Sequence, residues 1–179
     1  MKKQTLYKMT ESAILVALAV VLSWFKISIG GFGGSIDFVM IPLFVVCYRH
    51  GVSYGVAAGL VFGFVKCIIG GGIGWGLPSV LLDYVLAYGA IGVAGIFKGK
   101  SKLLEVSVLV GCISRFVIHF ISGVTIYAIT MPTEIMGTVI GNPTFYSIVY
   151  NALYMLPNTI IAIITIALLR YPLKRLKKI

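Results

Sequence analysis

Residues 52–69 read VSYGVAAGLVFGFVKCII, an apolar run interrupted by a single charge at Lys66. An α-helix needs about 20 apolar residues to cross the hydrocarbon core of a bilayer, so this run is long enough to be a membrane span. Similar runs recur along the chain, and the candidate spans lie near 10–29, 36–49, 52–69, 79–97, 103–130 and 144–169. The sequence therefore predicts an all-α integral membrane bundle of six transmembrane helices.

The composition excludes an ordinary soluble domain. Of the 179 residues 59% are hydrophobic and 11% are charged, and the mean hydropathy is +1.04. A soluble domain carries about 25% charged residues, so the solvent of this chain has to be lipid. The length predicts one transmembrane domain over 1–179, with no room for a soluble catalytic or nucleotide-binding domain.

The basic residues predict the topology. They sit in short clusters between apolar runs, so the net charge of +10 indicates membrane orientation and not nucleic-acid binding. All but three of the 15 fall on one side of a six-span chain: Lys2, Lys3, Lys8, Arg49, Lys98, Lys100, Lys102, Arg170, Lys174, Arg175, Lys177 and Lys178. Cytoplasmic loops retain positive charge, so we expect a multi-pass protein of the cell membrane with both termini in the cytoplasm.

The second span, near 36–49, is short and contains Pro42. We expect it to cross obliquely or only in part, with neighbouring helices satisfying any freed carbonyl group. The basic residues outside the clusters are Lys26, Lys66 and Arg115. A charge within an apolar segment is costly and usually has a partner or a function.

Polar residues of four spans converge in the outer half of this predicted bundle, at a rise of about 1.5 Å per residue. They are Lys66, Asp83, Arg115, His119, Tyr146 and Asn151. Aromatic residues at a similar depth are Trp75, Tyr84, Tyr127, Tyr146 and Tyr150. An acid, a histidine, an amide and aromatic rings suit a flat, nitrogen-rich cation, so we predict a pocket for such a ligand, open to the outside.

Each of these residues also has a purely structural interpretation. Lys66, Arg115 and Asp83 can form ion pairs, His119 can be a packed core residue, and the aromatic rings can belong to interfacial belts. Small residues are ambiguous in the same way. The stripe of Gly89, Gly92 and Gly95 favours packing within the bundle, whereas that of Ala13 and Ala17 suits either packing or docking to a separate membrane subunit.

No motif in the sequence indicates catalysis. The stretch 95–101 resembles a phosphate-binding loop, but Ala94 stands where that loop requires glycine, and a transmembrane helix precedes it instead of a strand. The three cysteines lack metal-ligand spacing. We therefore expect no metal and no cofactor, and a protein that is not an enzyme.

Several segments together carry a family resemblance. They are the Ala13-x-x-x-Ala17 stripe, LDYVLAY at 82–88 with GVAGIF at 92–97, RFVIHFISG at 115–123, and Tyr146 with Asn151. With the small size of the chain, they resemble the thiamine-specific substrate-binding subunits of energy-coupling factor transporters. The resemblance implies six helices, a thiamine site near the outer surface, and a complex with a membrane scaffold subunit and two cytoplasmic ATPases.

The resemblance also implies roles for individual residues. Asp83 stands where family members often have glutamate and would face the positive thiamine, with Tyr84 beside it. His119 and Tyr127 would lie against the rings, although relatives can have tryptophan at the position of Tyr127.

By the same resemblance, Tyr146 and Asn151 would bond the aminopyrimidine, and Ala13 and Ala17 would dock the partner. ATP hydrolysis would then occur in the partner subunits. The alternatives are a binding subunit for another vitamin or a thiamine precursor, a membrane-embedded enzyme, and a non-catalytic assembly subunit.

Overall fold

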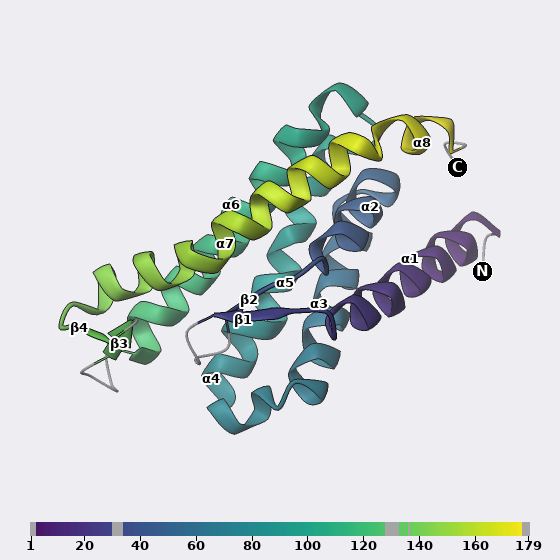
Figure 1. The fold of residues 1–179 in the computed structure, drawn as a ribbon. Coiled ribbons are helices and arrows are strands. Elements are labelled where there is room, and N and C mark those ends of the chain that lie inside the picture. Colours follow the sequence, from purple (N-terminus) through teal and green to yellow (C-terminus); the bar gives the residue numbers. More distant parts are fainter. Residues whose placement is uncertain (1–2, 30–33, 128–132, 136, 177–179) are drawn as a thin grey trace.

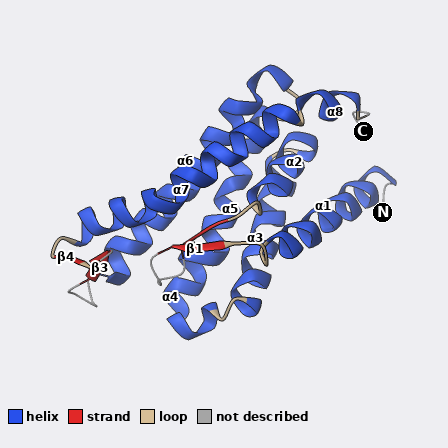
Figure 2. Ribbon diagram, viewed as in Figure 1, coloured by secondary structure: helices blue, strands red, loops and turns tan. Residues whose placement is uncertain are grey.

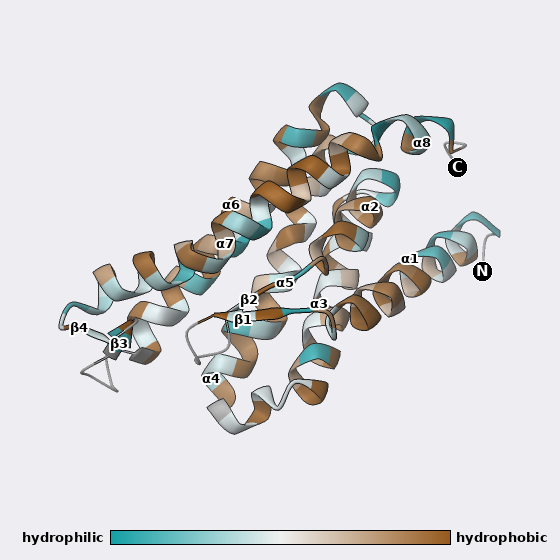
Figure 3. Ribbon diagram, in the orientation of Figure 1, coloured by the Kyte–Doolittle hydropathy of each residue, from teal (hydrophilic) through white to brown (hydrophobic). Residues whose placement is uncertain are grey.

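The computed structural model describes residues 3–29, 34–127, 133–135 and 137–176 and shows a helical bundle with two small hairpins (Figures 1 and 2). Within this part of the chain, five helices are long and apolar enough to cross a membrane: Lys3–Leu22, Val52–Ile69, Leu77–Phe97, Ser101–Ile126 and Pro143–Leu168. Hydrophobic residues cover long stretches of these helices (Figure 3). The predicted all-α membrane bundle is confirmed, with one shorter helix in the place of the second span.

The predicted bounds of the first helix are wrong. Helix α1 spans Lys3–Leu22, and the Ser23 hydroxyl donates to the Val20 carbonyl oxygen at 2.6 Å where the helix ends. The apolar residues that follow form strand β1 (Ile27–Ile29), which pairs antiparallel with β2 (Gly34–Ile36). A hydropathy window counts apolar residues and does not distinguish a strand from the end of a helix.

Helix α2 (Met40–His50) is the predicted short span. Its 11 residues rise about 16 Å, roughly half of the hydrocarbon thickness. It packs against α1, against α3 (Val52–Ile69) and against the C-terminal segment of the Leu77–Phe97 helix. Strand β2 leads into it, so helix and strand together take the place of a full second span.

The Leu77–Phe97 helix changes its winding along its length. It comprises α4 (Leu77–Ser79), a π-helical segment (Val80–Leu86), α5 (Ala87–Ala90) and a 3₁₀ segment (Ile91–Phe97). A short 3₁₀ turn at Gly72–Trp75 joins it to α3. π-Helical segments occur frequently at functional sites.

Helix α3 approaches the Leu77–Phe97 helix to backbone contact. A Cβ on Gly59 would lie 2.2 Å from the Tyr88 carbonyl oxygen, and one on Gly63 would lie 2.3 Å from that of Tyr84. Only glycine permits this approach. The facing stripe of Gly89, Gly92 and Gly95 points at α3, so its predicted role in packing within the bundle is confirmed.

Helices α6 (Leu104–Tyr127) and α7 (Pro143–Leu168) form the other side of the bundle and pack along each other. Between them lies a hairpin of β3 (Thr133–Ile135) and β4 (Thr138–Ile140). Asn142 caps α7, its Oδ1 accepting from the Thr144 and Phe145 amides at 2.9 and 3.1 Å. A short α8 (Arg170–Arg175) follows, and both described ends of the chain lie at the end of the bundle opposite the hairpins (Figure 1).

The small residues of α1 do not face the bundle. Ser12, Val16 and Ala19 form its buried side, whereas Ala13 and Ala17 are exposed. Of the two interpretations of this stripe, packing inside the bundle is therefore wrong, and a surface available to another helix is what the structure provides.

We expect Gly63→Ala to destabilise the protein. The added methyl group would meet the Tyr84 backbone, and overpacking of this kind costs about 1–3 kcal/mol, more than the ~1 kcal/mol that alanine gains over glycine in a helix. The thermal midpoint in detergent should fall. Gly74→Ala is the control, because a Cβ there has no atom within 4 Å, and equal midpoints for the two variants would contradict the close approach.

Candidate functional site

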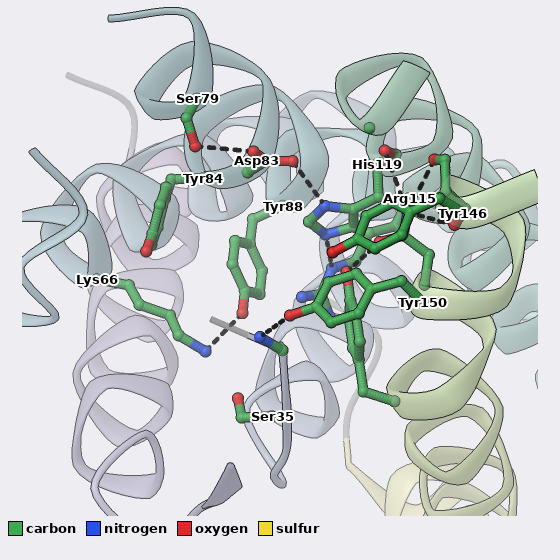
Figure 4. Close-up of a pocket in the computed structure, with 15 residues that line it drawn as sticks. Ser35, Lys66, Ser79, Asp83, Tyr84, Tyr88, Arg115, His119, Tyr146 and Tyr150 are labelled. Atoms are coloured by element: carbon green, nitrogen blue, oxygen red, sulfur yellow. Dashed lines mark hydrogen bonds and ion pairs between the residues drawn. The ribbon is translucent and has the colours of Figure 1, made fainter. Parts of the chain in front are cut away.

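A partly open cavity lies at the end of the bundle that carries the β1–β2 hairpin. It is lined by side chains and backbone of β2, α3, the Leu77–Phe97 helix, α6 and α7 (Figure 4). The lining residues are Gly34, Ser35, Lys66, Ser79, Asp83, Tyr84, Tyr88, Arg115, His119, Gly123, Tyr146, Ser147, Tyr150, Asn151 and Tyr154. The predicted convergence of polar residues from four spans is confirmed.

Two aromatic residues of the prediction cannot be placed in the cavity. Tyr127 is the last residue of α6, and its side chain and that of Trp75 lie outside what the structure describes. Tyr84 lies at the cavity wall, on the same π-helical segment as Asp83.

Asp83 is held by hydrogen bonds on both carboxylate oxygens. The Ser79 hydroxyl donates to Oδ2 at 2.8 Å, and Oδ1 lies 3.1 Å from His119 Nδ1 (Figure 4). The Asp83 side chain remains 22% exposed. The acid is thus both oriented by the protein and partly exposed where it lines the cavity.

The hydrogen bonds around His119 select one tautomer of its ring. Arg115 donates from Nε to His119 Nε2 at 3.3 Å, and a guanidinium group can only donate. Nε2 therefore accepts, and Nδ1 carries the proton that faces Asp83. Arg115 itself is buried, with its Cζ 4.1 Å from the centre of the Tyr88 ring. The spacing of four residues had placed Arg115 and His119 on one face of the helix, and both line the cavity.

A ladder of tyrosines on α7 forms another wall. Tyr146 and Tyr150 stack with centroids 5.7 Å apart and an interplanar angle of 7°, and Tyr154 follows edge-on at 5.7 Å from Tyr150. Tyr154 also meets the His119 ring edge-on at 5.9 Å. Sequence reasoning missed Tyr154, although the recurrence of tyrosine every four residues places the three on one helix face and was a readable signal.

Asn151 lies between the tyrosines and connects α7 to α6. Its Nδ2 donates to the Ser147 carbonyl oxygen at 2.8 Å and to that of His119 at 3.3 Å, and its Oδ1 accepts from the Tyr154 hydroxyl at 2.6 Å. The amide therefore orients its neighbours in addition to lining the cavity.

Lys66 also lines the cavity, and it has an acidic partner. Its Nζ lies 3.0 Å from Asp37 Oδ2 and donates to the Tyr88 hydroxyl at 2.6 Å. The ion-pair interpretation of Lys66 is confirmed, with Asp37 as the partner. Among the described residues, no group of three or more His, Cys, Asp or Glu side chains is placed to hold a metal ion.

Comparison with known proteins shows the family. Residues 9–178 match the model of a family described as "Thiamine transporter protein (Thia_YuaJ)". The chain belongs to this thiamine transporter family. A relative from Bacillus subtilis named thiamine transporter ThiT is 35% identical, over 99% of this chain and 97% of its own length.

Two further proteins are similar over most of the chain. A thiamine transporter ThiT from Lacticaseibacillus paracasei is 26% identical over 89% of this chain and 84% of its own length. A solved structure of ThiT from Listeria monocytogenes superposes with a TM-score of 0.83, covering 95% of this chain and 96% of the other at 24% identity. This member of the thiamine transporter family therefore has the fold of the solved ThiT structure.

Proposed function

We propose that residues 1–179 form a single substrate-binding domain, the thiamine-binding subunit of an energy-coupling factor transporter, which captures thiamine at the extracellular side. The chain contributes binding without catalysis, and partner subunits supply the energy. Membership of a thiamine transporter family supports thiamine as the ligand. The cavity of Asp83, His119 and the α7 tyrosines supports the location of the binding site.

The cavity offers groups of the right chemistry for a permanently cationic, two-ring ligand. Asp83 provides a negative charge, with Tyr84 beside it, and His119 provides a face for the rings, while the family resemblance assigns a second ring contact to Tyr127. Tyr146 and Asn151 provide hydrogen bonds for the aminopyrimidine. Lys66 is paired with Asp37, whereas the Asp83 carboxylate lines the cavity and is partly exposed, so Asp83 is the group that favours a cation.

Asp83→Asn tests the proposal most directly. The substitution preserves shape and removes the charge, and a charge-assisted contact contributes about 1.5–3 kcal/mol. Thiamine affinity should therefore fall by about ten- to a hundredfold in calorimetric titrations of monodisperse protein in detergent.

Three further variants calibrate that result. Asn151→Ala should weaken binding less than Asp83→Asn does, and His119→Ala should weaken it by removing a ring contact. Cys47→Ala, in the hydrophobic core away from the cavity, should leave it unchanged. If Asp83→Asn binds thiamine as tightly as the unmodified protein does, Asp83 has a structural role and does not bind the ligand. Mass spectrometry of the molecule that co-purifies with the protein would then identify what the cavity holds.

We also propose that both termini are cytoplasmic. Cysteines introduced at Lys100 and Glu134, which are exposed, should react with membrane-impermeant reagents from opposite sides. The native cysteines are buried and can be replaced by alanine for this purpose. Position 100 should label from the cytoplasm and position 134 from outside, and labelling of both from one side would reject the topology.

The proposed partners are a membrane scaffold subunit and two cytoplasmic ATPases, with the scaffold docking on Ala13 and Ala17. A leucine at either position should impair uptake of thiamine by cells while the isolated subunit still binds it, because both alanines face away from the bundle. Ala167→Leu, the same change at an exposed position of α7, is the control. Equal loss of uptake in all three variants would remove the docking assignment.

A further inference from the structure

A buried polar cluster lies behind the wall of the cavity, where β2 leads into α2. Asp37 is 4% exposed and Asn158 is 1% exposed, and neither is among the residues that line the cavity. Asn158 bonds the Asp37 amide, and the Asp37 carboxylate meets Lys66, which extends from α3. The cluster thereby joins the β1–β2 hairpin to two transmembrane helices.

The Asn158 side chain forms two hydrogen bonds of the kind that a neighbouring strand would form with the hairpin. Its Oδ1 accepts from the Asp37 amide at 2.9 Å, and its Nδ2 donates to the Ser35 carbonyl oxygen at 2.7 Å. In a strand, the carbonyl of one residue and the amide of the residue two positions later point to the same edge. β1 pairs with the opposite edge of β2, so one side chain of α7 completes the edge that the two-stranded hairpin leaves open. An unpaired strand edge at membrane depth is costly, and this contact removes part of that cost.

Asp37 fastens the same segment to α3. Its Oδ2 lies 3.0 Å from Lys66 Nζ and accepts from the Ser35 hydroxyl at 3.0 Å, while its Oδ1 accepts from the Val39 amide at 3.2 Å. Lys66 also donates to the Tyr88 hydroxyl at 2.6 Å (Figure 4). The ion pair therefore extends the connection to the Leu77–Phe97 helix.

Strand β2 is itself a wall of the cavity. Gly34 and Ser35 line it, and the Gly34 amide donates to the Tyr150 hydroxyl at 2.9 Å. A Cβ on Gly34 would lie 2.6 Å from Tyr154 Cδ1, so the strand lies directly against the tyrosine ladder. A small movement of β2 would change both the width of the cavity and the position of the Tyr150 hydroxyl.

We propose that Asp37, Lys66 and Asn158 form a lock that positions β2 as a wall of the binding cavity. Asp37 and Asn158 are positioning residues that act on the ligand through Gly34, Ser35 and the tyrosines. Asp37 has a second effect, because it balances the charge of Lys66 at the wall of a cavity for a cation. The effect on thiamine rests on the proposed function, whereas the effect on the hairpin does not.

The test combines a probe of the hairpin with a ligand titration. A nitroxide spin label is attached to a cysteine at Ile27, which is 69% exposed on β1, in protein whose three native cysteines are replaced by alanine. A second label at Val139, 60% exposed on β4, monitors the other hairpin. Electron paramagnetic resonance then reports the mobility of each hairpin, and calorimetry reports thiamine affinity for the same variants.

Two variants remove the contacts of the lock in different ways. Asn158→Leu removes the bonds to Ser35 and Asp37 and keeps a side chain of the same branched shape. Asp37→Asn with Lys66→Met removes the ion pair without leaving a buried charge alone, a change that proteins often tolerate. In both, the label at position 27 should become more mobile and the label at 139 should not. If correct placement of β2 falls to about a tenth of the population, thiamine affinity falls about tenfold.

Thr159→Val is the matched control, since its hydroxyl donates to the Met155 carbonyl oxygen within α7 at 2.7 Å. In this variant, the mobility of both labels and the affinity for thiamine should equal those of the unmodified protein. An immobile label at 27 in both released variants, or a mobile hairpin with unchanged affinity, would overturn the proposal. An equal increase in the mobility of the label at position 139 would also overturn the proposal, because it would indicate that the whole protein has loosened. If the unmodified protein binds no thiamine, the proposed function fails, while the two labels still decide whether the lock holds the hairpin.

Discussion

The backbone contact between α3 and the Leu77–Phe97 helix is the constraint on which the site depends. Glycines at 59 and 63 let α3 approach the carbonyl groups of Tyr88 and Tyr84 to a distance that no side chain would permit. This approach brings Lys66, near the end of α3, within hydrogen-bonding distance of the Tyr88 hydroxyl. It also holds the π-helical segment that carries Asp83 against a rigid neighbour. Larger residues at 59 and 63 would separate these groups.

Paired charge is the second requirement, because the site lies within helices long and apolar enough to cross a membrane. An isolated charge in lipid is costly, and the charged groups of the cavity are connected to one another: Lys66 pairs with Asp37, and Asp83 bonds His119, which in turn accepts from Arg115. Of the acids in this network, Asp83 lines the cavity with a partly exposed side chain, whereas Asp37 is buried behind it.

The sequence predicted features that depend on local patterns, and it did not predict contacts between residues that lie far apart along the chain. Asp83, Arg115, His119 and Asn151 could be placed in one cavity because helical rise and alternating topology determine the depth of each residue. The hairpin after α1 could not be foreseen, since Ile27–Ile29 is as apolar as a helix end, and the bond between Ser35 and Asn158 of α7 joins segments far apart in the chain. Asn158 is a further example: its spacing of seven residues from Asn151 places both amides on one helix face, but its bonds reach a segment 121 residues away, which no local pattern shows.

The sequence by itself determined the class of this protein, a membrane bundle of about six segments, because composition and the length of apolar runs respond to a bilayer whatever the tertiary contacts. It also indicated the residues of the candidate site and, through motifs, the transporter family. Only the tertiary structure decided which small-residue stripe is buried and which is exposed, since Ala13-x-x-x-Ala17 and the stripe at 89, 92 and 95 are alike as patterns and differ only in what they face. It likewise decided that Asp37 pairs with Lys66, because the distance between two side chains on different elements is set by how helices pack and not by their spacing along the chain.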